Sequence, residues 1–413
     1  MNTNDIQITL PSSKSLSVRW LLVDWLASEK IPLTGLSQAD DVKVMKRILG
    51  IIKNNVRQKP MVLDCGDAAS VARFILAALA MRPGEYVITG SSQLCGRPMM
   101  PLVKALQSME GPELTYLERE GYLPIKVKGN TPKRKLVAID PTQSSQFVSA
   151  LLFAGTILPN GLNVRMTVPP PSRPYIEMSC KVLSAAGANN DYAPHHTTIR
   201  VSPFVHRNHT RPIAIERDWS AAAFFYMAAL FLPHRRFRLL NLSKDSLQGD
   251  AVAADLFKHL GVSTLQSRSP YRGTNSLLIE GGGEATQRLV YNLGDNPDLI
   301  PPVAVACAAM GVDAIIKGIE TLRYKESDRL KAIAAELAKM NGQVTITDKH
   351  IHIHPSALHP VEPVETYSDH RIAMSFGMLK ILFPDIVIKD PQVVNKSFPL
   401  FWEQLGIVMK AIC

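Results

Sequence analysis

Cysteine is scarce and scattered in this chain of 413 residues. The cysteines are five, an odd number, and none lies in a Cys-x-x-Cys pair or at a Cys–His spacing that binds metals. This pattern argues against a disulfide framework and fits a reducing, cytoplasmic environment. They are Cys65, Cys95, Cys180, Cys307 and Cys413.

Long apolar runs are also missing. No run of about 18 residues is free of charge or proline, so we predict no membrane span. The first residues, MNTNDIQITLP, show no basic segment that leads into an apolar one, so we expect no secretory signal. At 46% hydrophobic, a chain of this length can bury substantial cores, and we expect two domains.

Positive charge is in excess, with a formal net charge of +10 and a pI of about 9.3. An anionic partner is therefore expected. The basic residues are dispersed, and their densest group, Lys126–Lys135, is equally consistent with a solvated hairpin. We expect no nucleic-acid partner on this basis.

Six stretches repeat one design, a polar start followed by an apolar, Ala-rich run. They follow one another at intervals of roughly 53 to 78 residues, and such a fixed period is typical of repeat architectures. A helix that is apolar all round is buried, and Ser, Asp or Asn stands where each N-cap belongs. If the starts of these helices converge, their unpaired N–H groups form an anion site. The runs begin at Lys14, Asp67, Gln143, Asp218, Asn296 and Ser368.

Short β-type runs bounded by Gly, Pro, Asn or Asp alternate with these helices, which predicts an α/β fold. Among these runs are IQITL, IKVKG, HIHIH and DIVIKD. No low-complexity linker marks a domain boundary. The chain is expected to cross between domains at Arg207–Pro212 and near Ser12, with three repeats on each side.

Three charged motifs point to chemistry. Each of them places a basic residue, Arg or Lys, beside a turn or a helix start. They are RYKESDR at 323–329, SDHR at 368–371 and NKSFP at 395–399. Arg binds phosphate and carboxylate through two parallel hydrogen bonds, and Lys adds a compact charge. Carboxylates among these bases suit a reaction that binds polyanions and also moves protons.

These motifs, together with LPSSKSLSVR, GRPMMPLVKAL, SSQF, SRPYIE, ERDWSAA, SLQGD and NPDL in this order, resemble the 5-enolpyruvylshikimate-3-phosphate (EPSP) synthase family, whose members are 3-phosphoshikimate 1-carboxyvinyltransferases (EC 2.5.1.19) of the shikimate pathway. The resemblance implies a transferase built as a two-domain, inside-out α/β barrel of six βαβαββ-type repeats. One domain would span residues 13–216 and bind mainly shikimate-3-phosphate, and the other would comprise residues 1–12 and 217–413.

The resemblance also implies a residue set for each substrate. The set for shikimate-3-phosphate is Lys14, Ser15, Arg19, Ser144, Ser145, Gln146, Ser172, Tyr175, Asp298 and Lys325. The set for phosphoenolpyruvate is Lys14, Arg97, Arg329, Arg371 and Lys396.

By the same resemblance, Asp298 accepts the proton of the attacking 5-hydroxyl, Glu326 protonates the methylene carbon of phosphoenolpyruvate, and Lys14 assists. Neither a metal nor a cofactor is implied. We expect a cytoplasmic monomer without nucleic-acid or membrane partners.

The chain departs from the family pattern at three places, the first of which is the loop Asp67–Arg73. The family has Gly where this chain has Ala69, and the neighbouring Asp67 adds a negative charge. Gln93 stands where the family has Arg, and Thr321 where it often has Asn. Since Gly allows a ligand to approach the backbone closely, our hypothesis is weakened binding of phosphoenolpyruvate and tolerance of glyphosate.

Three alternatives stay open at this stage. The first is a homologue that has lost activity through these changes. The second is UDP-N-acetylglucosamine enolpyruvyl transferase, although Cys95 lies only two residues before Arg97, whereas the reactive Cys of that enzyme lies five before its Arg-Pro. The third is a non-catalytic anion-binding protein.

Overall fold

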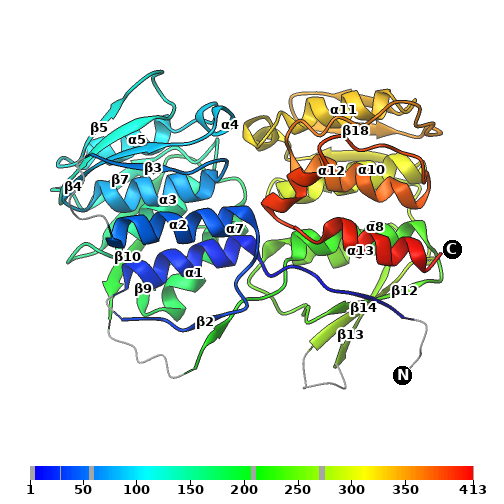
Figure 1. The fold of residues 1–413 in the computed structure, drawn as a ribbon, viewed down its shortest axis with the longest axis horizontal. Coiled ribbons are helices and arrows are strands. Elements are labelled where there is room, and N and C mark those ends of the chain that lie inside the picture. Colours follow the sequence, from blue (N-terminus) through cyan, green and yellow to red (C-terminus); the bar gives the residue numbers. More distant parts are fainter. Residues whose placement is uncertain (1–4, 28, 55–59, 206–210, 269–274, 413) are drawn as a thin grey trace. The chain divides into compact units, whose positions relative to one another are not determined.

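The chain divides into two compact units. Unit 1 comprises Met1–Ser13 and Glu216–Cys413, and unit 2 comprises Lys14–Ile215. The structure is a computed structural model that describes residues 5–27, 29–54, 60–205, 211–268 and 275–412 (Figure 1). The expected crossing at Arg207–Pro212 lies largely outside these ranges.

The described residues of unit 2 form two four-stranded sheets and one two-stranded sheet. In the order in which the strands pair, the first sheet is β3 (Met61–Asp64), β4 (Gly84–Thr89), β6 (Ile125–Gly129) and β5 (Glu113–Tyr116). The second is β7 (Leu136–Ile139), β8 (Leu162–Met166), β10 (Thr198–Phe204) and β9 (Ala188–Asn190). The short sheet pairs β2 (Leu33–Thr34) with β11 (Ile213–Ala214).

Unit 2 has its most buried helices at its centre. Helices α1 (Lys14–Leu26), α3 (Ala69–Ala80) and α6 (Gln146–Gly155) pack against one another. Their side chains are apolar on nearly every side, so burial of this surface stabilises the unit. The remaining helices are α2 (Asp40–Asn54), α4 (Ser92–Cys95), α5 (Met100–Ser108) and α7 (Arg173–Ala185).

In the part of unit 1 that the structure describes, two four-stranded sheets are likewise present. The first is β1 (Ile6–Ile8), β12 (Arg236–Leu240), β14 (Asn275–Glu280) and β13 (Ser263–Arg268). The second is β15 (Arg288–Asn292), β16 (Asp313–Lys317), β18 (His350–His354) and β17 (Gln343–Ile346).

The helices of unit 1 are stacked in layers (Figure 1). Helix α10 (Ile300–Met310) packs on α8 (Trp219–Phe231), α11 (Arg329–Ala338) and α12 (His370–Gly377). Every residue of α8 is buried, and its Phe224 packs edge-on against Phe401 of α13 (Phe401–Lys410). The others are α9 (Ala253–His259) and the 3₁₀ turns η1 (Gly249–Val252), η2 (Pro297–Leu299), η3 (Glu320–Tyr324), η4 (Met378–Ile381) and η5 (Pro391–Lys396).

The four-stranded sheets share one pattern of pairing. In each, the first two strands are parallel and the other pairs are antiparallel. The expectation of an α/β fold is confirmed. The six apolar runs also form buried helices as predicted: α1, α3, α6, α8, α10 and α12.

Three local predictions were wrong. Asp218 and Asp369 cap α8 and α12, but the N-cap residues of α3, α6 and α10 make no side-chain cap hydrogen bond. Asp67 accepts from Ser91, and the Asn296 amide donates to Asp250. At α6 it is Ser144, not the N-cap residue Ser145, whose hydroxyl accepts from the Gln146 N–H.

The second concerns DIVIKD, which forms no strand and makes only the bridge Val364↔Ile388. In this bridge the Val364 N–H donates to the Val387 carbonyl at 2.8 Å and the Lys389 N–H donates to the Val364 carbonyl at 3.0 Å. The third concerns Lys126–Lys135, which was compared with a solvated hairpin. A hairpin would require β6 and β7 to pair with each other, but β6 pairs with β4 and β5, and β7 pairs with β8.

Candidate active site

The starts of α8, α10 and α12 meet in unit 1, where acidic side chains connect them. The Asp250 carboxylate accepts from Ser220 Oγ at 2.5 Å and from Asn296 Nδ2 at 3.2 Å, which joins the start of α8 to the turn before α10. The Asp298 carboxylate accepts from Arg371 Nη2 at 3.1 Å, which joins that turn to α12. Carboxylates of the protein itself therefore connect these three helix starts through side-chain hydrogen bonds.

Arg329 is at the centre of this network and is only 1% exposed. Its Nε donates to Asp369 Oδ2 at 2.8 Å and its Nη2 to Asp369 Oδ1 at 3.2 Å. Its Nη1 donates to Asp298 Oδ1 and its Nη2 to Glu326 Oε2, each at 2.9 Å. One guanidinium thus orients three carboxylates.

Lys325 completes the network, and its ammonium lies 3.5 Å from Asp298 Oδ1. Asp298, Lys325, Glu326, Arg329 and Arg371, which the resemblance assigned to the reaction, are therefore brought together. Lys396 is buried at the end of η5, and His370 Nδ1 lies 3.8 Å from Asp369 Oδ1.

The charges in this network act on its carboxyl groups in opposite ways. Burial alone would raise the pKa of Asp298, but Lys325, Arg371 and Arg329 outweigh burial and hold the pKa well below its usual value. Burial, with the nearby negative charge of Asp298, raises the pKa of Asp250. Asp298 is therefore ionised at neutral pH, whereas Asp250 holds its proton to a higher pH than a free carboxyl group.

A second cluster of predicted residues lies in unit 2, around the starts of α1 and α7. Lys14 is the first residue of α1, and its Nζ lies 3.1 Å from Asp41 Oδ2. Arg19 is buried and donates to Ser179 Oγ at 2.8 Å and to the carbonyl oxygens of Ser15 and Tyr175. Burial lowers the pKa of Arg19 to about 10, so it keeps its charge at neutral pH.

Arg73 links α3 to the start of α6. Its Nη1 donates to Gln146 Oε1 at 2.8 Å and to Ser144 Oγ at 3.2 Å, and its Nη2 donates to the Pro98 carbonyl. Its guanidinium also stacks over the Phe147 ring at 4.8 Å. Two residues predicted to bind substrate are thus oriented by a buried arginine.

The other predicted residues of unit 2 occupy helix starts and turns. Ser145 precedes α6 and is buried, and Ser172 precedes α7 in the left-handed conformation with φ 55°. Tyr175 lies in the first turn of α7. Arg97 follows α4 and is half-buried.

The residues at which the chain departs from the family pattern lie in three elements of the structure and in the turn before α3. Ala69 is the first residue of α3 and is buried, and Asp67 accepts a hydrogen bond from Ser91. Gln93 lies within α4, and Thr321 is buried in η3.

Four residues of these clusters were not predicted from the sequence: Arg73, Asp41, Asp250 and Asp369. A signal existed for Arg73, because it is the one charge inside the apolar run VARFILAALA and a buried guanidinium requires acceptors. Asp369 lies within SDHR, a motif in which the bases alone had indicated a site. The partners of Asp41 and Asp250 depend on tertiary contacts.

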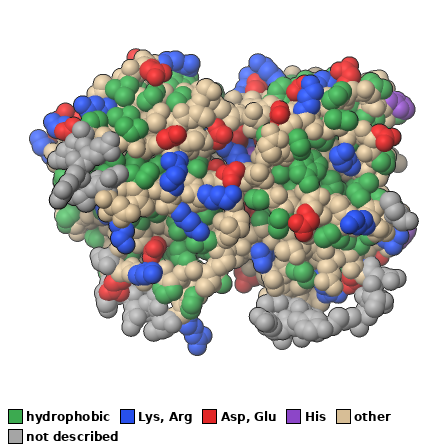
Figure 2. Space-filling model, in the orientation of Figure 1, with side chains coloured by type: hydrophobic (Ala, Val, Ile, Leu, Met, Phe, Trp, Pro, Cys, Tyr) green, Lys and Arg blue, Asp and Glu red, His purple; other side chains and the backbone are tan. Residues whose placement is uncertain are grey.

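Within the described ranges, no group of three or more His, Cys, Asp or Glu residues is arranged to hold a metal ion. No helix among those residues combines the length and apolar character needed to cross a membrane. On the face drawn in Figure 2, the coloured Lys and Arg side chains are interspersed with acidic and apolar ones and form no continuous stripe.

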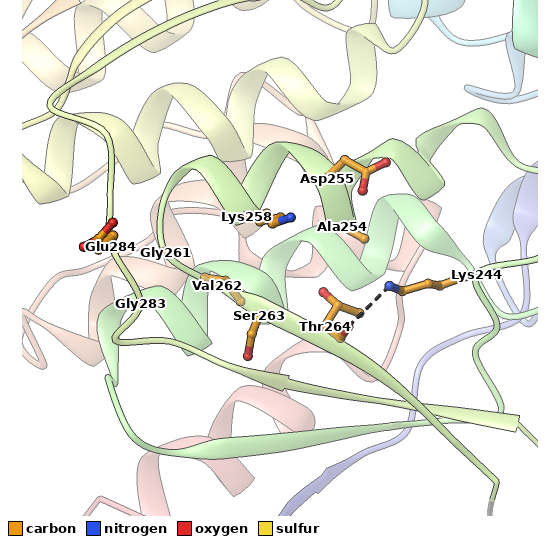
Figure 3. Close-up of a pocket in the computed structure, with 10 residues that line it drawn as sticks. All are labelled: Lys244, Ala254, Asp255, Lys258, Gly261, Val262, Ser263, Thr264, Gly283 and Glu284. Carbon is orange, nitrogen blue, oxygen red and sulfur yellow. Dashed lines mark hydrogen bonds between the residues drawn. The ribbon is translucent and has the colours of Figure 1, made fainter.

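A cavity of about 420 Å³ lies elsewhere in unit 1, between α9 and the start of β13 (Figure 3). Lys244 and Lys258 line it together with Asp255 and Glu284, and Lys244 Nζ donates to the Thr264 carbonyl. Its charges balance, and none of the predicted site residues lines it.

This chain is similar to known proteins over nearly its whole length. Residues 4–405 match the family model described as EPSP synthase (3-phosphoshikimate 1-carboxyvinyltransferase). A 3-phosphoshikimate 1-carboxyvinyltransferase of Bacteroides fragilis is 34% identical over 403 residues, which cover 96% of this chain and 94% of the relative. One of Erwinia tasmaniensis is 32% identical over 431 residues, covering 97% and 96%.

Among solved structures, an EPSP synthase from Acinetobacter baumannii superposes with a TM-score of 0.73 at 22% identity, covering 97% of this chain and 94% of that one. At this identity the likeness shows the fold. The family match and the relatives extend over nearly the whole chain, and so the chain belongs to the EPSP synthase (3-phosphoshikimate 1-carboxyvinyltransferase) family.

Proposed function

We propose that this chain transfers the enolpyruvyl group of phosphoenolpyruvate to the 5-hydroxyl of shikimate-3-phosphate. The products are 5-enolpyruvylshikimate-3-phosphate and phosphate, and the reaction belongs to chorismate and aromatic amino acid biosynthesis in the cytoplasm. The observation that carries the proposal is the network around Arg329, which combines cations for a polyanion with Asp298 and Glu326 for proton transfer.

Phosphoenolpyruvate would be bound by Lys14, Arg97, Arg329, Arg371 and Lys396. Arg329 and Arg371 are paired with Asp298, so the substrate has to compete with this carboxylate. When the substrate's negative charge takes up these cations, Asp298 loses part of the field that holds its pKa low. Binding would thus raise the basicity of Asp298 when a base is needed.

The chemistry is addition followed by elimination. Asp298 takes the proton of the 5-hydroxyl as its oxygen attacks C2 of phosphoenolpyruvate, and Glu326 protonates the methylene carbon. Loss of phosphate from C2 and of a proton from the new methyl group then restores the double bond. Fixed guanidinium and ammonium groups stabilise the charge that develops.

Shikimate-3-phosphate would be bound mainly by unit 2. Ser144 and Gln146 are held by Arg73, and Lys14 begins the buried helix α1. With Asp298 and Lys325, the full set would be Lys14, Ser15, Arg19, Ser144, Ser145, Gln146, Ser172 and Tyr175. Hydroxyl and amide groups of this set suit a phosphate and ring hydroxyls.

The repeating pattern of the sheets supports an inside-out α/β barrel built from six βαβαββ-type repeats. In two of the six, the sheet would be reduced to the β2–β11 pair and to the Val364↔Ile388 bridge. The two domains would be residues 13–216 and residues 1–12 with 217–413, each containing three repeats. The enzyme would act as a monomer.

The proposed reaction is tested by measuring phosphate release from phosphoenolpyruvate with shikimate-3-phosphate, beside UDP-N-acetylglucosamine as the other acceptor. We expect turnover with shikimate-3-phosphate alone. Turnover with the nucleotide sugar alone would favour the sister enzyme. The absence of turnover with both would favour an inactive homologue or an anion-binding protein.

The altered loop leads to a separate prediction. Ala69 begins α3, where a methyl group replaces the family's glycine, so we expect weakened phosphoenolpyruvate binding and tolerance of glyphosate. Ala69→Gly should lower the KM for phosphoenolpyruvate by about three- to tenfold, equivalent to removing one crowded methyl group. Strong competitive inhibition of the original chain by glyphosate, unchanged in Ala69→Gly, would contradict this.

A further inference from the structure

The turn before α12 has an unfavourable backbone. Tyr367 and Ser368 are consecutive non-glycine residues in the left-handed region, each with φ 53°. Side chains rarely adopt this conformation, and such residues persist only where the surroundings impose it. The neighbouring structure must therefore supply contacts that hold this turn.

The turn delivers two groups to the network around Arg329. The Asp369 N–H donates to the Thr366 carbonyl at 2.8 Å, so the turn closes immediately before α12. The Asp369 carboxylate then accepts from Arg329 and, at 2.8 Å, from the N–H of Arg371. If the turn relaxes, this carboxylate and the start of α12 move together.

Glu336 supplies the contacts that hold the turn. Its side chain is fully buried, and its carboxylate accepts from the Tyr367 hydroxyl at 2.6 Å and from the Glu365 N–H at 3.1 Å. Lys339 Nζ donates to it at 2.9 Å and balances its charge. Burial, with the hydrogen bond to Glu336, raises the pKa of Tyr367, so its hydroxyl remains a donor at neutral pH.

Helix α11 connects both ends of this arrangement. Arg329 is its first residue, and Glu336 follows seven residues later, on the same face and about 10 Å along the axis. Helix α11 thus presents Arg329 to the network and, through Glu336, also holds the turn that precedes Arg371. A change at Glu336 or Tyr367 would alter the distance between Arg329 and Arg371 without touching either.

We propose that Glu336 and Tyr367 are positioning residues, which hold the turn at Tyr367–Ser368 so that Asp369 and Arg371 stay in register with Arg329. The inference rests on the proposed function, because it assumes that both arginines bind phosphoenolpyruvate. It predicts a selective effect on that substrate. Binding of shikimate-3-phosphate alone, which the proposed function places mainly in unit 2, should not respond.

Tyr367→Phe tests the proposal by removing one hydroxyl. The KM for phosphoenolpyruvate should rise about tenfold, since a hydrogen bond to a buried charge is lost. The Kd for shikimate-3-phosphate, measured by calorimetry without phosphoenolpyruvate, should stay within twofold. The matched control is Tyr226→Phe, which removes a buried hydroxyl 3.0 Å from Thr264 in the same unit and should leave both constants unchanged.

A second variant tests the role of the backbone. Glycine adopts the left-handed region readily, so Ser368→Gly added to Tyr367→Phe should recover at least threefold of the lost affinity for phosphoenolpyruvate. Asn241→Gly, which relieves the same type of conformation elsewhere in unit 1, is the control and should recover nothing.

Amide hydrogen exchange provides a readout that does not depend on activity. In Tyr367→Phe the amides of Asp369 and Arg371 should exchange about tenfold faster, and in Tyr226→Phe they should not. If the original chain shows no turnover, the proposed function fails, but the exchange rates still decide whether the contact holds the turn. An unchanged KM for phosphoenolpyruvate in an active, folded Tyr367→Phe, or unchanged exchange at both amides, would overturn the proposal.

Discussion

The two units differ in how they carry charge. Unit 2 contains 25 Lys and Arg against 14 Asp and Glu, a formal charge of +11, and unit 1 contains 21 against 22, a charge of −1. The excess positive charge of the whole chain therefore resides in unit 2, although the ionic network around Arg329 is in unit 1.

The partners of the buried arginines differ in the same way. In unit 2, the acceptors described for Arg19 and Arg73 are hydroxyl, amide and carbonyl oxygens. In unit 1, Arg329 and Arg371 are paired with carboxylates. Under the proposed function, an anionic substrate would be attracted by unit 2 directly, whereas in unit 1 it would compete with Asp298 for Arg329 and Arg371, so that binding and proton transfer would be coupled.

The largest expected effect comes from breaking the ionic network in unit 1. Asp298→Asn removes the proposed base and should lower kcat by a factor of about 10³, within the usual contribution of general base catalysis. The same change frees positive charge, so the Kd for phosphoenolpyruvate should decrease. Steady-state kinetics and calorimetry measure the two effects. Asp313→Asn, at a partly exposed ion pair with His352 and Arg288, is the control.

An increased Kd for phosphoenolpyruvate in Asp298→Asn would contradict the view that this carboxylate competes with the substrate.

Replacing a buried arginine of unit 2 should have a smaller effect, limited to the affinity for one substrate. Arg73→Lys keeps the charge but loses the fork that holds Ser144 and Gln146, so the Kd for shikimate-3-phosphate should rise about tenfold. Because the described acceptors of Arg73 are neutral, the pH dependence of kcat should not shift. Calorimetry measures the Kd for shikimate-3-phosphate, and a pH–rate profile measures the pH dependence of kcat. A shifted profile would contradict the view that the arginines of unit 2, unlike those of unit 1, are not coupled to proton transfer.

The smallest expected effect is on stability. Folding raises the pKa of Asp250, so its contribution to stability is fully present below the unfolded pKa of about 3.9 and is lost as pH rises through the folded pKa. Asp250→Asn does not titrate. We therefore compare the Tm of Asp250→Asn with that of the original chain at each pH. The variant's Tm minus the original Tm should be about 2–4 °C larger at pH 7 than at pH 4, equivalent to about 1 kcal/mol.

Scanning calorimetry at both pH values measures this difference. A difference in Tm that is the same at pH 4 and pH 7 would show that Asp250 does not titrate with folding.

Most of the secondary structure was predictable because its signals are local. Buried helices such as α8 are apolar on every side, and strands such as β18 alternate, so each is visible within a dozen residues. The prediction of a strand at DIVIKD failed because a strand requires a paired partner, and here the pairing is limited to the bridge Val364↔Ile388. The helix caps failed where polar side chains had partners elsewhere in the fold, as with Asp67 and Ser91.

The sequence by itself determined the α/β class, the buried helices and, through its motifs, the family to which the chain belongs. Tertiary structure alone decided which charges meet. Asp298, Arg329, Asp369 and Arg371 span more than 70 residues, and only the packing of α10, α11 and α12 brings them within hydrogen-bonding distance. Whether a carboxylate serves as a cap, a counterion or a base depends on its distance to such partners, because electrostatic energy varies with separation and burial rather than with position in the chain.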